Sequence, residues 1–285
     1  MPLKRIISLK INSILPIFLP SFAIKENALK PQVELSLQMG ILGMGYTHSD
    51  LGGFAGGKEF NKEMYIRWLQ YGVFQPIYRP HAQDNIAPEV VFHDKETQDI
   101  LRKFIKLRYS LLPYNYTLAY QNSTTGMPLM KPLFLDDGFE SELNNKLMDN
   151  ATSYFWGDAF LVTPIVDAGV KSVSVPLPEG VWFDGFSDKK FQGGQSAMLK
   201  TSLNTLPLMV RAGSFIPMIE EIQSTKDYNN SKLTLHYYAD KTVNSSNKIM
   251  YEYDGKSFQS VKHITHSKYY TLTPNKIAIV KQRIT

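Results

Sequence analysis

One short segment of the chain combines a histidine, an acidic residue and a pair of glycines. Residues 46–54 read YTHSDLGGF, and we expect residues 44–48 to be extended, so that a strand leads into Asp50. In parallel α/β folds, the carboxyl ends of strands form the face on which sites are built. Glycines there let the backbone approach a ligand closely. The alternative is that Asp50 caps a turn in which Gly52 and Gly53 only supply positive φ.

A second cluster, YRPHAQD at residues 78–84, follows the next segment that we expect to be extended. His81 could donate to a substrate hydroxyl, act as a general base or bind a metal, and a purely structural role is the plain alternative. His48, Asp50 and His81 could together hold a metal, but the chain has no H-x-x-x-H helix pattern, so we expect no metal site. The glycines at 52–57 lack the lysine–serine ending of a phosphate loop.

The elements that position these clusters alternate between helical and extended patterns as far as residue 123. Helices are predicted over residues 33–39, with Ile41 on the buried side, and over residues 59–71. An extended segment is predicted over residues 73–78. A further helix should begin at Asp94, and Pro113 should kink it or restart it. This order is typical of parallel α/β units.

After residue 125 the pattern changes to short β runs separated by turns. Strands are predicted over 160–166, 172–177, 208–211, 215–218, 233–238, 248–253 and 276–280, with glycine turns at 179–180, 184–185, 212–213 and 254–255. The polar, aperiodic stretch 220–231 is a domain boundary in this interpretation. Such short, punctuated strands predict β-sandwich domains.

Composition excludes several classes of protein. The chain has 43% hydrophobic and 20% charged residues, which is ordinary for a globular protein. Its net charge of +5 is mild, and no basic run is interleaved with aromatic residues, so we expect no nucleic-acid partner. The absence of cysteine excludes disulfides and thiolate metal sites.

The first 23 residues have the layout of a secretory signal, with basic residues first, an apolar run at 14–19 and small residues near the end. Pro16 and Pro20 interrupt this layout, and the run is shorter than the roughly 20 residues that a transmembrane helix needs. We therefore expect no transmembrane segment. A true signal peptide would make the protein periplasmic or secreted. The alternative is a leader created where a longer reading frame was broken, which would leave the protein in the cytoplasm.

Six motifs in a fixed order resemble glycoside hydrolase family 31, which includes α-glucosidases and α-xylosidases. They are MGYTHSDLGGF (44–54), YIRWLQYGVF (65–74), YRPH (78–81), LRYSLLPY (107–114), WGDAFLV (156–162) and LMVRAGSFIP (208–217). Each motif is modest alone, but their order and spacing together make the resemblance strong. The position of Lys131 commonly holds arginine in that family, and we interpret the lysine as a minor change at the surface.

The resemblance implies a fold that is α/β plus all-β, namely the C-terminal part of a TIM barrel followed by one or two β-sandwich domains. The implied regions are a leader or non-family N-terminus (1–27), a partial barrel with the seventh and eighth strands (28–125), a proximal C-terminal β-sandwich (126–220) and a distal C-terminal β domain (221–285).

The resemblance also implies roles for four residues. Asp50 and His81 match family residues that bind hydroxyls of the sugar in the −1 subsite. Phe54 matches an aromatic residue beside the leaving-group sugar, and Arg79 matches an arginine that supports that wall. The implied ligand is an α-linked oligosaccharide or glycoside, and no cofactor is expected.

The two catalytic motifs of the family do not occur in this sequence. A retaining glycosidase needs two carboxylates about 5–5.5 Å apart. In family 31 the nucleophile lies in a W-x-D-M-N-E type motif and the acid/base in a G-D-N or G-D-V type motif. We therefore assign no catalytic residue. The enzyme class implied is an α-glucosidase-type hydrolase of carbohydrate metabolism, and we expect this chain to be inactive alone.

Two other interpretations remain open. One is a non-catalytic carbohydrate-binding or scaffold fragment. The other is a fragment that completes a barrel together with a separately encoded N-terminal half.

Overall fold

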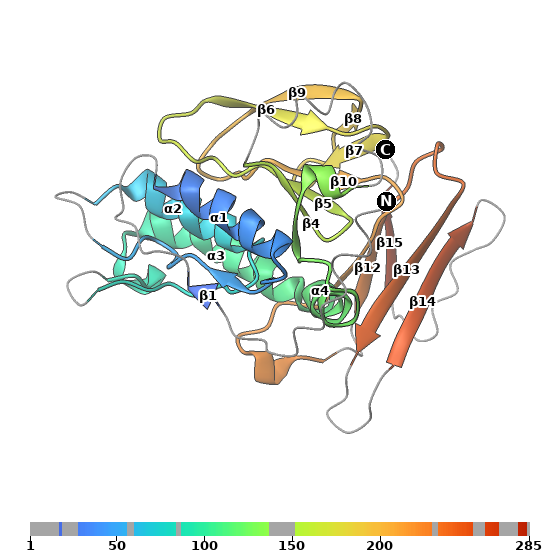
Figure 1. Cartoon of the computed structure of the whole chain (residues 1–285), viewed down its shortest axis with the longest axis horizontal. Coiled ribbons are helices and arrows are strands. Elements are labelled where there is room, and N and C mark those ends of the chain that lie inside the picture. The colour runs from blue at the N-terminus through green and yellow to red at the C-terminus, as the bar shows by residue number, and fades with distance from the viewer. Residues whose placement is uncertain are drawn as a thin grey trace.

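A computed structural model describes residues 28–55, 60–83, 87–136, 152–229 and 233–252, together with the backbone of three strands at 17–18, 260–267 and 279–283. The N-terminal part contains β1 (Ile17–Phe18), α1 (Leu29–Ile41), β2 (Thr47–His48), α2 (Lys62–Gly72), the short 3-10 helix η2 (Val90–Phe92), α3 (Lys95–Ser110) and α4 (Leu112–Thr125). The strand β1 pairs in parallel with β2, and a parallel bridge joins Leu51 to Pro80. Helices α1, α2 and α3 lie side by side on one side of the molecule (Figure 1).

The starts of α2 and α3 are set by side-chain caps. The side chain of Asn61 accepts a hydrogen bond from the Met64 amide at 3.0 Å, so α2 begins at Lys62 rather than at 59. Asp94 accepts from the Thr97 amide at 3.1 Å, which confirms the predicted start of α3. Pro113 lies in the first turn of α4, where proline is tolerated because the amide there has no helical partner. The predicted restart at this proline is confirmed.

Two expectations for this part are wrong. Ile41 was expected on the buried side of its helix, but it is 42% exposed. The neighbouring Gly40 faces the β domain instead, and a Cβ added to Gly40 would lie 3.1 Å from Pro128. The segment 73–78 is not a strand. Its first residues form a turn that continues α2, in which the Phe74 amide donates to the Tyr71 carbonyl at 3.0 Å.

The proximal β domain is built around a six-stranded antiparallel sheet in the order β3-β4-β5-β10-β7-β8. Its strands are β3 (Met130–Pro132), β4 (Tyr154–Trp156), β5 (Phe160–Val162), β10 (Leu208–Arg211), β7 (Val181–Asp184) and β8 (Lys190–Gln192). The pair β6 (Ser172–Leu177) and β9 (Gln195–Lys200) forms a second layer. The predicted strands over 172–177, 208–211 and 215–218 have the observed bounds. The strand predicted at 160–166 ends at Val162.

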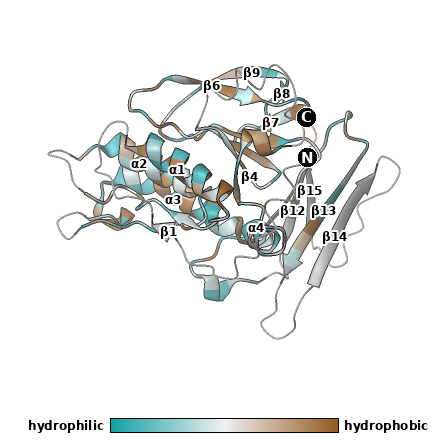
Figure 2. Ribbon diagram, in the orientation of Figure 1, coloured by the Kyte–Doolittle hydropathy of each residue, from teal (hydrophilic) through white to brown (hydrophobic). Residues whose placement is uncertain are grey.

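The central strands of this sheet are buried on both faces, so their apolar residues follow one another without alternating with polar ones. Tyr154 and Trp156 face the core shared with the helices, whereas Phe155 between them faces β6 and β9 together with Trp182. Helices α1 and α2, by contrast, carry both hydrophobic and hydrophilic residues along their length (Figure 2). The sequence analysis missed β3, β4 and β8, whose three residues carry too short a pattern, and it also missed β7, β9 and β14 (Ser260–Ser267).

The distal β strands are β11 (Phe215–Met218), β12 (Thr234–Tyr238), β13 (Ser245–Glu252), β14 (Ser260–Ser267) and β15 (Ile279–Arg283). The order of one sheet is β11-β12-β15, and β13 pairs with β14. The turn predicted at 254–255 lies outside the described residues. Between residues 220 and 229 the chain forms only one short 3-10 helix, η4 (Thr225–Asp227). No helix in the described part of the chain is long and apolar enough to cross a membrane.

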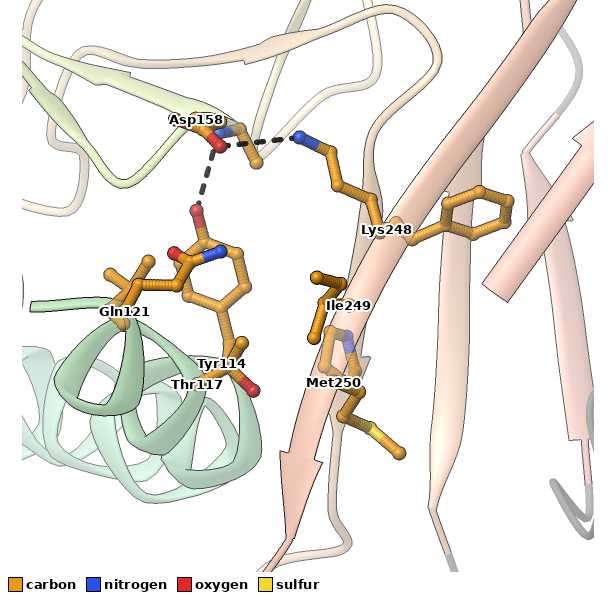
Figure 3. Close-up of a pocket in the computed structure, with 11 residues that line it drawn as sticks. Tyr114, Thr117, Gln121, Asp158, Lys248, Ile249 and Met250 are labelled. Atoms are coloured by element: carbon orange, nitrogen blue, oxygen red, sulfur yellow. Dashed lines mark hydrogen bonds and ion pairs between the residues drawn. The ribbon is translucent and has the colours of Figure 1, made fainter. Parts of the chain in front are cut away.

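Helix α4 joins the distal strands to the rest of the molecule. Tyr120 of α4 stacks on Tyr251 of β13 with ring centroids 4.1 Å apart, and the Tyr251 amide donates to the Thr117 hydroxyl at 3.0 Å. A cavity of about 30 Å³ separates α4 from β13, and Lys248 points across it toward Asp158 (Figure 3).

Lys131 is also part of this junction. It is 7% exposed, and its ammonium lies 2.5 Å from the Asp158 carboxylate. Our interpretation of Lys131 as a surface change is therefore wrong. The lysine stem is packed inside the domain, where its charge needs a partner.

Candidate functional site

The segment after β2 forms a tight turn. Asp50 has φ of 44°, and Gly52 and Gly53 have φ of 95° and 90°. The Gly53 amide donates to the Asp50 carbonyl at 2.8 Å, which closes the turn. Aspartate enters the left-handed region more readily than most residues do, and glycine does so without a steric penalty. The turn proposed as the plain alternative is therefore present, and it also fixes where the Asp50 side chain lies.

The Asp50 carboxylate lies against the ring of a buried histidine, His48. Asp50 is 4% exposed, and its Oδ1 lies 3.0 Å from Nδ1 of the fully buried His48. The other ring nitrogen of His48 lies 2.9 Å from the carbonyl of Arg79 and donates to it. One imidazole thus links the two segments that the sequence singled out. His48 was considered in the sequence as a metal ligand, and its role as a link was missed.

Backbone contacts bring the second cluster alongside the first. The Leu51 amide donates to the Arg79 carbonyl at 3.2 Å, next to the parallel bridge between Leu51 and Pro80. Farther along, the Gln83 amide donates to the Phe54 carbonyl at 2.9 Å. The two segments therefore run side by side in parallel and form the edge of the candidate site.

The side chains of this edge contact one another. His81 Nδ1 lies 3.1 Å from an Arg79 guanidinium nitrogen, and because that nitrogen always carries hydrogen, His81 accepts. The rings of Phe54 and His81 have centroids 5.5 Å apart and are tilted by 53°. The four predicted site residues, Asp50, Phe54, Arg79 and His81, thus belong to one local cluster. Their contacts with a sugar stay a prediction.

A layer of polar side chains beneath the edge holds it in place. The Ser49 hydroxyl donates to Gln75 Oε1 at 2.8 Å and lies 3.3 Å from the indole nitrogen of Trp68. Arg108 of α3 donates to the carbonyls of Val73, Gln75 and Pro76 at 2.7, 2.8 and 2.9 Å. Burial lowers the pKa of Arg108 to about 10, so the guanidinium keeps its charge at neutral pH.

Sequence reasoning missed this supporting layer. The signal was present, because Gln75 and Arg108 are polar residues next to strongly apolar runs. Their partners are carbonyl groups, however, and these have no sequence signature.

The arrangement can bind hydroxyl groups through a carboxylate, an imidazole and an aromatic face. Within the described residues, Asp50 is the one carboxylate of these two segments, whereas Asp84 lies outside them. No group of three histidine, cysteine or acidic residues in the described part of the chain is placed to hold a metal ion. The cluster is therefore suited to hold a polar ligand, and its described residues include no second carboxylate of the kind that glycoside cleavage needs.

Comparisons with known proteins agree with this geometry. The family model of the glycosyl hydrolases family 31 TIM-barrel domain matches residues 23–118, and that of the glycosyl hydrolase family 31 C-terminal domain matches residues 126–216. The chain belongs to glycoside hydrolase family 31. The predicted fold class is confirmed as well: this family 31 chain forms the C-terminal part of a TIM barrel followed by β domains.

The chain is similar in sequence and in structure to several known proteins. The chain is 32% identical over 252 residues to a probable glucan 1,3-alpha-glucosidase of Oryza sativa, and the aligned region covers 87% of this chain and 27% of the relative. It is 36% identical over 192 residues to human neutral alpha-glucosidase AB, and this alignment covers 66% of this chain and 20% of the relative. The structure of a family 31 dextranase from Flavobacterium johnsoniae matches with a TM-score of 0.74 at 31% identity, and the match covers 83% of this chain and 30% of the dextranase. The chain spans less than a third of the length of each of these proteins.

Proposed function

We propose that this family 31 chain forms one wall of a binding site for an α-linked glucoside. In this proposal Asp50 and His81 bind hydroxyls of the terminal sugar, Phe54 packs on the next sugar, and Arg79 holds His81 in position. The observation that carries the proposal is the parallel pairing at Leu51 and Pro80, because it sets the two clusters side by side. The three similar proteins named above are two α-glucosidases and a dextranase, which supports an α-glucoside as the ligand.

We do not propose that this chain alone hydrolyses a glycoside. The described site contains one carboxylate, and the sequence lacks both family motifs that carry the nucleophile and the acid/base. We expect the purified chain to bind isomaltose or maltose weakly, with Kd on the order of 1 mM, and to leave p-nitrophenyl α-glucoside intact. Turnover of this substrate that Asp50→Ala abolishes would contradict the inactive state.

Calorimetry with isomaltose tests the wall itself. Asp50→Asn should weaken binding about 10-fold, because it removes a charge-assisted hydrogen bond. The matched control is Asp99→Asn, which changes an exposed carboxylate that pairs with Lys95 on the surface of α3. Equal affinity of the Asp50→Asn variant and the unchanged chain would remove Asp50 from the binding site.

A second candidate function is completion of a barrel by another polypeptide. Three apolar side chains around the end of α1 are exposed, namely Ile41 (42%), Leu42 (65%) and Met44 (41%). A surface of this kind favours coverage by a further part of the barrel. Glucosidase activity that appears only after mixing with a separately encoded N-terminal half would support this function. Unchanged inactivity, with no complex in gel filtration, would contradict it.

A further inference from the structure

A cavity of about 260 Å³ lies where α3, the six-stranded sheet and β12 meet. It shares no residue with the candidate site. Cavities at the junction of domains are common places for small ligands. Its volume is slightly below the usual range for drug-sized ligands, about 300–1,000 Å³, so it suits a molecule with a single ring.

The floor of this cavity is apolar. The residues that form it come from α3, β5, β10 and β11 and from the segment that joins α3 to α4, namely Phe104, Leu107, Leu111, Phe160, Leu208, Ile216 and Met218. A sugar ring placed there would bury hydroxyl groups among these side chains, and each unpaired hydroxyl would cost free energy. The floor therefore favours a hydrocarbon ring over a carbohydrate.

The rim of the cavity supplies hydrogen-bond donors. Lys103 and Asn204 are exposed there, and the lysine ammonium donates to the Asn204 side-chain oxygen at 3.3 Å. That contact uses one of the three ammonium hydrogens and one of the two lone pairs of the asparagine oxygen. His236 also lines the cavity and is half-buried, and no residue that lines the cavity is acidic. A ligand group at this rim should therefore be an acceptor, and a negative charge suits it best.

An aromatic side chain borders the opening. Phe186 is 44% exposed, and its ring lies 5.9 Å from that of Phe104 in an edge-on arrangement. Aromatic rings prefer this spacing, so a ligand ring between the rim and the floor would find a further aromatic partner.

We propose that this cavity binds a small aromatic carboxylate, with its ring on Phe104 and Leu107 and its carboxylate at Lys103 and His236. The ring fills the apolar floor, and the carboxylate accepts hydrogen bonds at the rim. This site is independent of the α-glucoside site.

Titration of the full chain with benzoate tests the site, with benzamide as the neutral comparison of the same shape. Benzoate should bind with Kd on the order of 1 mM, and benzamide should bind about 10-fold more weakly. Lys103→Met should weaken benzoate binding about 10-fold. Lys106→Met is the matched control, because Lys106 lies on the same helix and pairs with Glu221 instead of lining the cavity.

Filling the cavity separates this site from nonspecific binding. Leu107→Trp should abolish benzoate binding, and Met218→Trp does the same from another part of the floor if the first variant fails to fold by circular dichroism. The proposal is overturned if benzoate fails to bind at about 10 mM, if a folded filled variant binds it unchanged, or if benzamide or methyl α-glucoside binds equally well.

Discussion

At the scale of single residues, the candidate site depends on backbone conformations that few residue types adopt. Asp50 and the two glycines after it all have positive φ, and the chain reverses there within three residues. Motif analysis of the sequence located this loop, because glycine pairs and a single acidic residue are visible in the chain. The contact of His48 with both Asp50 and the Arg79 carbonyl was not predictable, because it joins residues 31 positions apart.

Gly52→Ala should destabilise the chain through two separate effects. The methyl group would strain a backbone with φ of 95°, and an added Cβ would lie 2.8 Å from the ring of the buried Tyr65. We expect a loss of about 2–4 kcal/mol in the free energy of unfolding, measured by urea denaturation.

Gly180→Ala provides the matched control for this effect. Gly180 has φ of 107°, and an added Cβ would meet nothing within 4 Å. It should lose about 1–2 kcal/mol, which is the backbone strain alone. Equal losses in the two variants would show that Tyr65 does not pack tightly against the site loop.

At the scale of elements, the Arg108 side chain binds backbone carbonyls that a neighbouring strand would otherwise pair with. The sequence predicted an extended segment over 73–78, where a barrel strand would bond its carbonyls to a neighbour. The structure forms a turn there, and the Arg108 guanidinium binds three of these carbonyls instead. Helical periodicity over four turns predicted α3 well, because it needs no information from distant segments. It could not reveal that Arg108 would support the backbone near Arg79 and His81.

Arg108→Met should destabilise the fold and weaken sugar binding together. The variant keeps the apolar stem but leaves three carbonyl groups without a donor, so we expect a loss of about 2–4 kcal/mol. The site segment should then be less ordered, and isomaltose affinity should fall with it. Arg102→Met, an exposed substitution on the same helix, should change neither quantity. Loss of stability with unchanged isomaltose affinity would separate Arg108 from the site.

At the scale of the whole molecule, the parts share an apolar core and are also joined by polar contacts at their borders. The six-stranded sheet was predictable in kind, because short alternating strands with glycine turns indicate a sandwich. Its strand order was not predictable, since β10 lies between β5 and β7 and so pairs residues far apart in the sequence. The same limit applies to the clamp between β3 and β13, where Lys131 and Lys248 meet at Asp158. Sequence reasoning placed Lys131 at the surface because its partner is 27 residues away.

The clamp at Asp158 should make the stability of the chain sensitive to acid. Burial alone would raise the pKa of Asp158, but the charges of Lys131 and Lys248 outweigh it and lower the pKa to about 2, from an ordinary 3.8. A carboxyl whose folded-state pKa is lowered stabilises the fold above its unfolded pKa and loses that contribution as the pH falls through the folded pKa. Asp158→Asn should therefore lower the free energy of unfolding at pH 7 by about 1 kcal/mol, a modest value because the carboxylate is half-exposed. The difference from the unchanged chain should shrink between pH 4 and pH 2.

Urea denaturation across this pH range separates the clamp from general acid sensitivity. Asp99→Asn is the control, because that carboxyl also has a lowered pKa but forms an exposed pair within one helix. It should change stability little at any pH, since exposed pairs are screened by solvent. A stability difference for Asp158→Asn that stays constant down to pH 2 would show that the carboxylate charge does not join the domains. The α4–β13 junction would then rest on the stacking of Tyr120 on Tyr251 and on the hydrogen bond from the Tyr251 amide to the Thr117 hydroxyl.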